Sequence, residues 1–229
     1  MRINKLLSNY GLCSRKEANK WIEEGRIQVN GELCTPGQWI ELSDEILLDG
    51  NPIKEQEKVY LILNKPVGIT CTAARNIEGN IIDFLNFEQY IFPVGRLDKE
   101  SEGLILMTND GELANRILEA DNHHEKEYIV TVDKKIDDKF INGMAQGVKI
   151  LGVITRPCKV KMVDDYTFKI ILTQGLNRQI RRMVKTFGLN VTKLKRIRIL
   201  SIELSDLETG GWRKLSKDEI QNLKRVCNK

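Results

Sequence analysis

Residues 95–108 read GRLDKESEGLILMT, a polar and charged loop that runs directly into an apolar segment. The uninterrupted apolar residues at 104–107 predict a buried strand. A polar loop anchored to a buried strand is where scaffolds commonly hold reactive side chains. Taken alone, Asp98, Glu100 and Glu102 form either an acidic turn or a divalent-metal site. The acidic turn is the simpler interpretation, because the calcium-loop pattern is missing.

The sequence beyond residue 58 alternates between strand-like and helix-like patterns. Short turns such as Asp164-Asp165 join neighbouring strands. This organisation predicts an α+β fold with a largely antiparallel sheet flanked by helices, and it disfavours a doubly wound sheet. The predicted strands lie near 59–63, 104–108, 128–132, 158–163 and 167–172, and the predicted helices near 80–86, 111–119, 138–145, 178–187 and 216–226.

The start of the chain predicts a separate small unit. Apolar residues recur at helical spacing over 2–10 and again over 14–25, where Ser14 and Glu17 form a capping box. Asn30-Gly31 is typical of a two-residue hairpin turn, and a further strand is expected at 46–48. We therefore predict two helices followed by short strands.

A polar stretch at 51–58 separates this unit from the rest of the chain. It contains a proline just after the Asp49-Gly50 turn, and its composition is that of a linker. The predicted domains are therefore 1–50 and 59–229.

The overall composition gives only a weak indication of an anionic partner, because the net positive charge is small. The 229 residues carry a net charge of +4, with 30% charged and 41% hydrophobic residues. Neither a long apolar run nor a basic leader is present, so we expect no membrane span, no signal peptide and a cytoplasmic location. The five cysteines lack paired metal or redox spacings, which indicates reduced thiols.

Basic residues concentrate in one region. Between residues 178 and 198 there are eight Lys or Arg and no Asp or Glu. Such a run usually forms a solvated face. Here apolar residues are interleaved with it, which favours a basic surface fixed on a packed element and suited to a phosphate backbone.

The amino-terminal helices present a basic side. The outward residues are Arg2, Lys5, Arg15, Lys16 and Lys20. The stretches RINK at 2–5, CSRKEA at 13–18 and IQVNG at 27–31 resemble the alpha-L RNA-binding domain. The resemblance favours RNA binding over the alternative of a helix pair that only caps the second domain.

Four motifs in the second domain occur in a fixed order. They are NKPVGI at 64–69, GRLD at 95–98 with the following SEGL, KEY at 126–128 and GLNRQIRRM at 175–183. Together with the amino-terminal unit they resemble the RsuA family of ribosomal RNA pseudouridine synthases. HEKEY at 124–128 and the Leu176-Asn177 pair most resemble the RluF-type enzymes of that family, which act on 23S RNA.

The resemblance implies roles for three residues. Asp98 matches the catalytic aspartate, which acts as nucleophile or base, and Arg181 matches its basic partner. A nearby guanidinium would keep the carboxylate ionised where RNA displaces water, through a charge-assisted and even bidentate pair. Tyr128 matches the tyrosine that lies against the target base. Without the resemblance, Tyr128 would be interpreted as a core aromatic. For Arg181, a phosphate contact on the helix surface would be as good an interpretation as partnership with Asp98.

Further arginines are expected to contact RNA. By resemblance Arg96 helps to extrude the uridine from its stack, at a cost of a few kcal/mol, or holds the flipped nucleotide. The alternative for Arg96 is a surface salt bridge to Glu100 or Glu102. Arg178 and Arg182 are also predicted RNA contacts.

The predicted enzyme is a monomer that needs no metal and no nucleotide cofactor. Its expected partner is ribosomal RNA, and transfer RNA is left open as a second substrate. The main alternative function is that of a non-catalytic RNA chaperone or ribosome-assembly factor. A less favoured alternative is a metal-dependent phosphodiesterase whose metal would be bound by Asp98, Glu100 and Glu102. Elsewhere we predict that Lys65-Pro66 form a supporting turn and that His123-His124 are no metal pair. Trp39 and Trp212 are interpreted as packing residues, and for Trp212, beside Gly210-Gly211, a place near a surface loop is left open.

Overall fold

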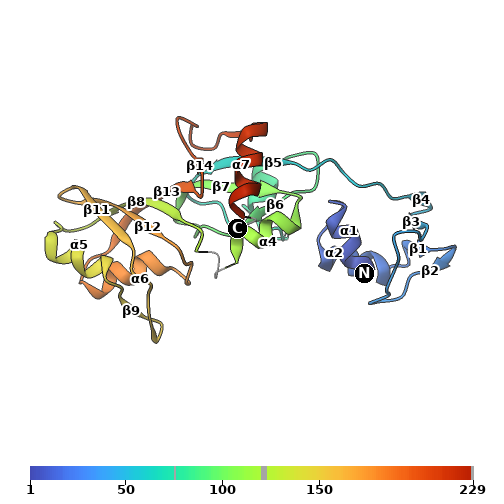
Figure 1. Cartoon of the computed structure of the whole chain (residues 1–229), viewed down its shortest axis with the longest axis horizontal. Coiled ribbons are helices and arrows are strands. Elements are labelled where there is room, and N and C mark those ends of the chain that lie inside the picture. Colours follow the sequence, from blue (N-terminus) through green and yellow to red (C-terminus); the bar gives the residue numbers. More distant parts are fainter. Residues whose placement is uncertain (75, 120–122, 228–229) are drawn as a thin grey trace.

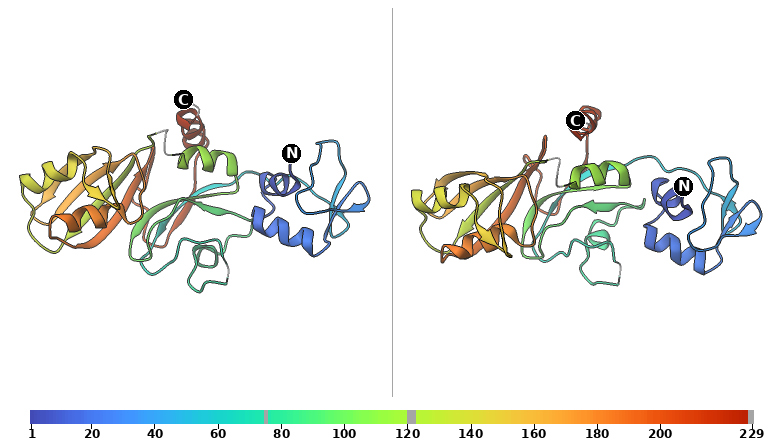
Figure 2. Two further views of the ribbon diagram at one scale, coloured as in Figure 1. Left: turned by 90° about the horizontal axis from the view of Figure 1, so that it is seen from below. Right: turned by 60° about the horizontal axis from the view of Figure 1, so that its bottom comes forward.

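The chain forms two units joined by an extended segment (Figure 1). The computed structural model describes residues 1–74, 76–119 and 123–227. The small amino-terminal unit lies at one end of an elongated molecule, and the helices α5 and α6 lie at the other end. Two further views show the same arrangement (Figure 2).

The amino-terminal unit packs two helices against a four-stranded antiparallel sheet of order β2-β1-β3-β4. Ile3, Leu7 and Ile27 are completely buried in its core. The elements are α1 (Ile3–Asn9), α2 (Arg15–Glu23), β1 (Ile27–Val29), β2 (Glu32–Leu33), β3 (Ile46–Leu48) and β4 (Asn51–Pro52).

Local sequence signals explain how this unit turns. The Ser14 side chain accepts a hydrogen bond from the Glu17 backbone N–H at 3.1 Å and so caps α2, as predicted. Asn30 and Gly31 both adopt positive φ, 52° and 84°, which is what a two-residue hairpin turn of this hand requires. The segment beyond β4 folds back on α1, where the Gln56 N–H donates to the Tyr10 carbonyl at 2.8 Å.

The larger unit is built on a nine-stranded sheet whose main path runs β11-β12-β8-β13-β7-β5-β15. β6 pairs with β7, and β14 pairs with β13. Its strands are β5 (Tyr60–Lys65), β6 (Phe92–Val94), β7 (Glu102–Thr108), β8 (Lys126–Val132), β11 (Lys159–Asp164), β12 (Thr167–Leu172), β13 (Val191–Ile199), β14 (Ile202–Glu203) and β15 (Trp212–Lys214), with the hairpin β9 (Lys149–Ile150) and β10 (Val153–Ile154) apart from them. Its helices are α3 (Ile81–Leu85), α4 (Gly111–Leu118), α5 (Asp138–Ala145), α6 (Gln179–Thr186) and α7 (Lys217–Cys227).

The sheet has two halves with separate cores. In the half formed by β5 and β7, Ile62 and Leu106 pack with α4 and α7 on one face, while Leu61 and Ile105 pack with α3 on the other. Apolar residues on both faces explain why all six residues of β5 are buried. In the other half, α5 and α6 cover one face of β8, β12 and β13 around the buried Phe168.

A short parallel contact joins the two halves. β13 pairs with β7 through Lys195–Glu102 and Arg196–Gly103, whereas the other strand pairs in the described residues are antiparallel. A Cβ atom on Gly103 would lie 2.2 Å from the Arg196 carbonyl oxygen, and Gly103 has φ of 106°. Only glycine fits this point without displacing backbone.

The predicted α+β class and its helices agree with the structure, but the central strand was not predicted. Residues 191–199 form β13 within the run that we interpreted as a basic surface. The strand has register irregularities on both sides of Lys195 and buries Arg196, so its residues do not alternate between polar and apolar. The basic run is therefore divided between α6 and β13, and its Arg196 is buried.

Trp39 is 72% exposed, so the prediction that it is a packing residue was wrong. Trp212 is 43% exposed and packs edge to face with Phe87 at a centroid distance of 5.5 Å, in agreement with the alternative that left it near a surface loop. Within the described residues, no helix combines the length and apolar character needed to cross a membrane.

We expect Gly103→Ala to destabilise the chain by about 3 kcal/mol, because the added methyl group collides with backbone and the φ value is strained for alanine. Urea unfolding measures the loss. Gly111→Ala is the matched control, since a Cβ at Gly111 would meet no atom within 4 Å. Equal free energies of unfolding of the two variants would contradict the conclusion that only glycine fits at position 103.

Candidate active site

Asp98 lies in the loop between β6 and β7, and backbone contacts hold this loop in place. The Ser101 N–H donates to the Asp98 carbonyl at 3.0 Å, and the Gly68 N–H donates to the Lys99 carbonyl at 2.8 Å. Leu97 is buried in the core beside Cys71. The carboxylate is therefore presented from a fixed backbone, although its side chain remains 30% exposed.

Lys65 supports the neighbouring turn, as the sequence predicted. Its side chain is completely buried, and its ammonium donates to the carbonyls of Pro66 at 2.7 Å and Ile69 at 2.9 Å. Burial lowers the pKa of Lys65, and nearby carboxylates including Asp98 oppose that shift. The residue thus fixes the turn and cannot reach a phosphate in this conformation.

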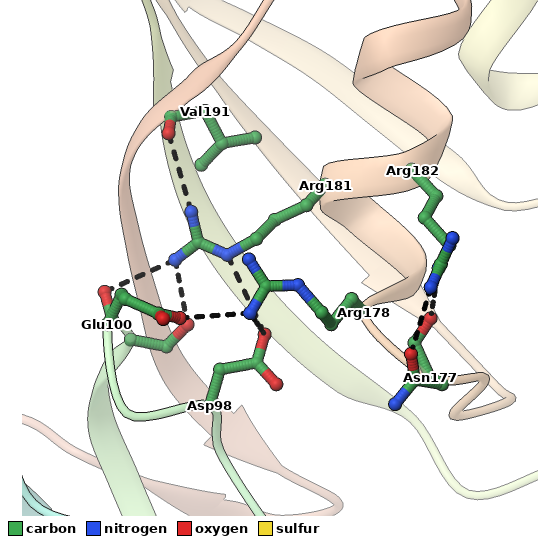
Figure 3. A network of polar contacts seen from close by, with 8 residues as sticks. Asp98, Glu100, Asn177, Arg178, Arg181, Arg182 and Val191 are labelled. Carbon is green, nitrogen blue, oxygen red and sulfur yellow. Dashed lines mark hydrogen bonds and ion pairs between the residues drawn. The ribbon is translucent and has the colours of Figure 1, made fainter.

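Two arginines from the start of α6 approach the Asp98 carboxylate (Figure 3). Arg181 Nε lies 3.6 Å from Asp98 Oδ2, and Arg178 Nη1 lies 3.9 Å from the same oxygen. Arg178 also donates to Glu100 Oε2 at 3.0 Å. Arg178 holds this position with φ of 49°, a left-handed backbone that is rare outside glycine.

Arg181 is anchored more firmly than Arg178. Its Nη2 donates to the Glu100 carbonyl at 3.2 Å and to Ser101 Oγ at 3.1 Å, and its Nη1 donates to the Val191 carbonyl at 3.4 Å. Its buried Nε has no hydrogen-bond partner among the residues that the structure describes, because Asp98 lies just beyond hydrogen-bonding distance. The expected bidentate pair is therefore replaced by a single ionic contact.

Tyr128 lies on β8, in the wall of the same cleft. A cavity of about 570 Å³ is lined by Arg96, Asp98, Tyr128, Leu176 and Arg178, among others. A smaller hollow of about 130 Å³ adjoins it and is lined by Asp98, Tyr128 and Arg181. Tyr128 also packs against the cores of both halves of the sheet. It is therefore both a packing residue, as the alternative interpretation predicted, and part of the cleft wall.

The remaining predicted RNA contacts occupy three places. Arg96 is exposed in the cleft, and among the described residues it forms no ion pair with Glu100 or Glu102. Arg182 is exposed on α6 and donates to Asn177 through Nε at 3.0 Å and Nη2 at 3.2 Å. The five predicted RNA contacts of the amino-terminal unit, Arg2, Lys5, Arg15, Lys16 and Lys20, are all exposed.

The acids of the loop are occupied by cations. Glu100 pairs with Arg178 at 3.0 Å, and Glu102 pairs with Lys193 at 3.4 Å. In the part of the chain that the structure describes, no three His, Cys, Asp or Glu side chains form a group that could hold a metal ion. His124 is buried against the Ile117 carbonyl, 3.1 Å from its Nδ1.

Two cations at the inner wall of the cleft were not singled out from the sequence. Arg196 is 3% exposed, and its Nε donates to the Leu104 carbonyl at 2.7 Å across the junction of the two sheet halves. Its Nη2 is buried without a hydrogen-bond partner in the described structure. Lys126 lines the same cavity, and its pKa is lowered by burial and by the charge of Arg196. The sequence did not reveal the register of β13 against β8, and only that register would have indicated that Arg196 and Lys126 line the same cavity.

A family model described as RNA pseudouridylate synthase matches residues 59–186, more than half of the chain. The chain belongs to this family. A second model, the S4 domain, matches residues 1–46. Members of the synthase family isomerise uridine in RNA, so the chain is an RNA-modifying isomerase.

Individual relatives of this synthase extend along nearly the whole chain. It is 50% identical to the dual-specificity RNA pseudouridine synthase RluF of Salmonella typhi over 97% of this chain and 78% of the relative. It is 32% identical to the ribosomal large subunit pseudouridine synthase B of Bacillus subtilis over 99% of this chain and 97% of the relative. A crystal structure of a pseudouridylate synthase matches with a TM-score of 0.71 and 30% identity, covering 97% of this chain and 99% of that one.

We expect Lys126→Met to stabilise the synthase at neutral pH, with a gain that declines as the pH approaches 10.5, the ordinary pKa of lysine. The pKa of Lys126 is lower in the folded state than in the unfolded state. At pH values between this lowered pKa and 10.5, the unfolded chain therefore binds more protons than the folded chain. The free energy of unfolding of the native chain therefore rises through this window.

Urea unfolding of both proteins between pH 7 and pH ~10.5 measures the difference. Lys139→Met, on the exposed side of α5, provides the background for the same substitution. A gain for Lys126→Met that stays constant across the range would contradict the assigned cause.

Proposed function

We propose that this synthase isomerises a specific uridine of ribosomal RNA, with large-subunit RNA as the favoured substrate, and that Asp98 is its catalytic carboxylate. The observation that carries the proposal is the cleft in which Asp98 faces the guanidinium of Arg181 at 3.6 Å beside Tyr128. Arg181 stands 15% exposed and is held by three backbone or side-chain acceptors, so it supplies a fixed positive charge.

The reaction needs only groups that this cleft contains. The bond between uracil N1 and ribose C1′ breaks, the base rotates, and a bond forms between C5 and C1′. The proton leaves C5, and N1 ends up protonated. Asp98 acts as nucleophile or base in the first step, and Arg181 faces it with a fixed positive charge. Tyr128 lies against the base and assists proton removal from C5.

Access to the base requires extrusion from the RNA stack. Unstacking costs a few kcal/mol, which contacts to the flipped nucleotide must offset. Arg96 suits this role, because it is exposed at the cleft and forms no ion pair with the neighbouring glutamates in the described structure. Arg178 lines the same cavity, and Arg182 lies one turn further along α6, so we assign both as RNA contacts near the site.

The amino-terminal unit supplies a second RNA contact through Arg2, Lys5, Arg15, Lys16 and Lys20. We place the boundary between this unit and the catalytic unit within residues 53–58, because residues 51 and 52 of the predicted linker form β4 of the amino-terminal sheet. The relatives named RluF are described as dual-specific, and transfer RNA is the second substrate class that we propose to test. We further propose that the enzyme acts as a monomer in the cytoplasm, without a cofactor.

Asp98→Asn should abolish pseudouridine formation, lowering kcat at least ~10⁴-fold, while RNA affinity stays within about threefold. The amide keeps the shape of the side chain but can neither attack nor accept the proton. Asp165→Asn, at an exposed turn aspartate paired with Lys135, is the control and should turn over normally. Full turnover by Asp98→Asn would refute the assignment.

The same variant separates catalysis from RNA chaperone activity in cells. Pseudouridine mapping of ribosomal and transfer RNA from a strain that lacks the gene should reveal the missing site, and the unmodified chain should restore it. Asp98→Asn should not restore it. If every modification persisted in the deletion strain, the chain would be an RNA-binding protein without this activity.

Arg181→Lys should lower kcat about 100-fold with little change in RNA affinity. One ammonium cannot contact Val191, Glu100 and Ser101 together while facing Asp98, so the carboxylate loses its fixed partner. Single-turnover kinetics at saturating RNA measure the effect. Lys185→Ala, on the exposed side of the same helix, is the control, and equal rates for both variants would exclude this role for Arg181.

A further inference from the structure

An exposed tryptophan is held rigidly at the edge of the amino-terminal unit. The indole of Trp39 is 72% exposed, although burial of so large an aromatic ring would be favourable. Its backbone is fixed on both sides. The Ile3 N–H donates to the Gln38 carbonyl at 3.0 Å, and the Ile40 N–H donates to the Met1 carbonyl at 2.8 Å. Trp39 also forms a bridge with Arg2, so the two side chains start from adjacent backbone.

The surroundings of the indole are basic. A hollow of about 310 Å³ is lined by Met1, Arg2, Asn4, Lys5, Arg15 and Trp39. In the described structure, Arg2, Lys5 and Arg15 form no ion pair with a carboxylate. By contrast, Lys20 pairs with Glu24 and Arg26 pairs with Asp49. The hollow therefore combines an apolar ring face with uncompensated positive charge.

This combination fits single-stranded nucleic acid. Proteins that bind unpaired strands stack bases on aromatic side chains and hold the backbone with basic residues, and each stacked base contributes measurably to affinity. A duplex hides the faces of its bases and would use the charges but not the ring. An acidic peptide would also use the charges, but it offers no flat face to the indole.

We propose that Trp39 is a stacking platform for an unpaired RNA base, with Arg2, Lys5 and Arg15 binding the adjoining phosphates. The proposal rests on the proposed function, because it names the form of RNA that the amino-terminal unit takes. Lys5 and Arg15 also line a second hollow of about 570 Å³, whose opposite wall includes Gly111 and Asn115 of α4. A bound strand can therefore continue from Trp39 toward the catalytic unit.

The test compares two fluorescein-labelled RNA hairpins with the full chain by anisotropy. One hairpin is blunt, and the other carries a single-stranded overhang of about six nucleotides. The unmodified chain should prefer the overhang. Trp39→Ala should lose about tenfold in affinity for the overhang hairpin and little for the blunt one. Trp39→Phe keeps an aromatic face and should retain most of the preference.

Leu42→Ala is the matched control, since Leu42 is 78% exposed in the same unit but lies beside acidic residues. It should bind both hairpins as the unmodified chain does. Loss of affinity by Trp39→Ala that is equal for both hairpins, or no loss at all, would overturn the proposal. Competition by polyglutamate as strong as that by the overhang RNA would overturn it as well, in favour of an acidic protein partner.

Binding is measured without turnover, so this test stays separate from that of the proposed function. If the chain formed no pseudouridine in ribosomal RNA, the overhang preference and its dependence on Trp39 would still be observed. If the synthase were active but the platform absent, turnover would persist with equal affinity for the two hairpins.

Discussion

The close approach of β13 to β7 at Gly103 and Arg196 is the constraint on which the site depends. The two halves of the sheet have separate cores, and this parallel pairing, with the Arg196–Leu104 hydrogen bond across it, joins them. Asp98 is carried by the loop that leads into β7, whereas Arg181 is carried by α6 on the other half. The distance between the carboxylate and its cation is thus set by backbone packing several residues away.

Electrostatic balance in the cleft follows from this construction. The buried Arg196 and the half-buried Lys126 line the cavity, and the neighbouring carboxylates of Glu100 and Glu102 are already paired with arginine or lysine. Asp98 differs from its acidic neighbours because its contacts with arginine are long and, among the described residues, leave Arg181 Nε without a hydrogen-bond partner. A carboxylate that is not held in a short ion pair has an oxygen accessible to a substrate.

Much of the fold could be predicted from local patterns, because capping boxes, hairpin turns and apolar periodicity act over a few residues. The Ser14 cap and the Asn30-Gly31 turn are examples. β13 could not be predicted, since its charged residues follow no strand alternation and its burial depends on two partner strands. The same limit applies to the site. Motif order led us to propose Asp98, Tyr128 and Arg181, but the positions of Arg196 and Lys126 in the cleft depend on strand register.

The placement of Asp98 and Arg181 on different halves of the sheet has an evolutionary consequence. The junction of β7 and β13, together with the contacts of Gly68 and Leu97, fixes the groups that we propose to react. Leu118 and residues 173–175 line other parts of the cleft, and they can change without moving this pair. Relatives built on this plan can diverge in the nucleotide they recognise while inheriting an unchanged chemistry.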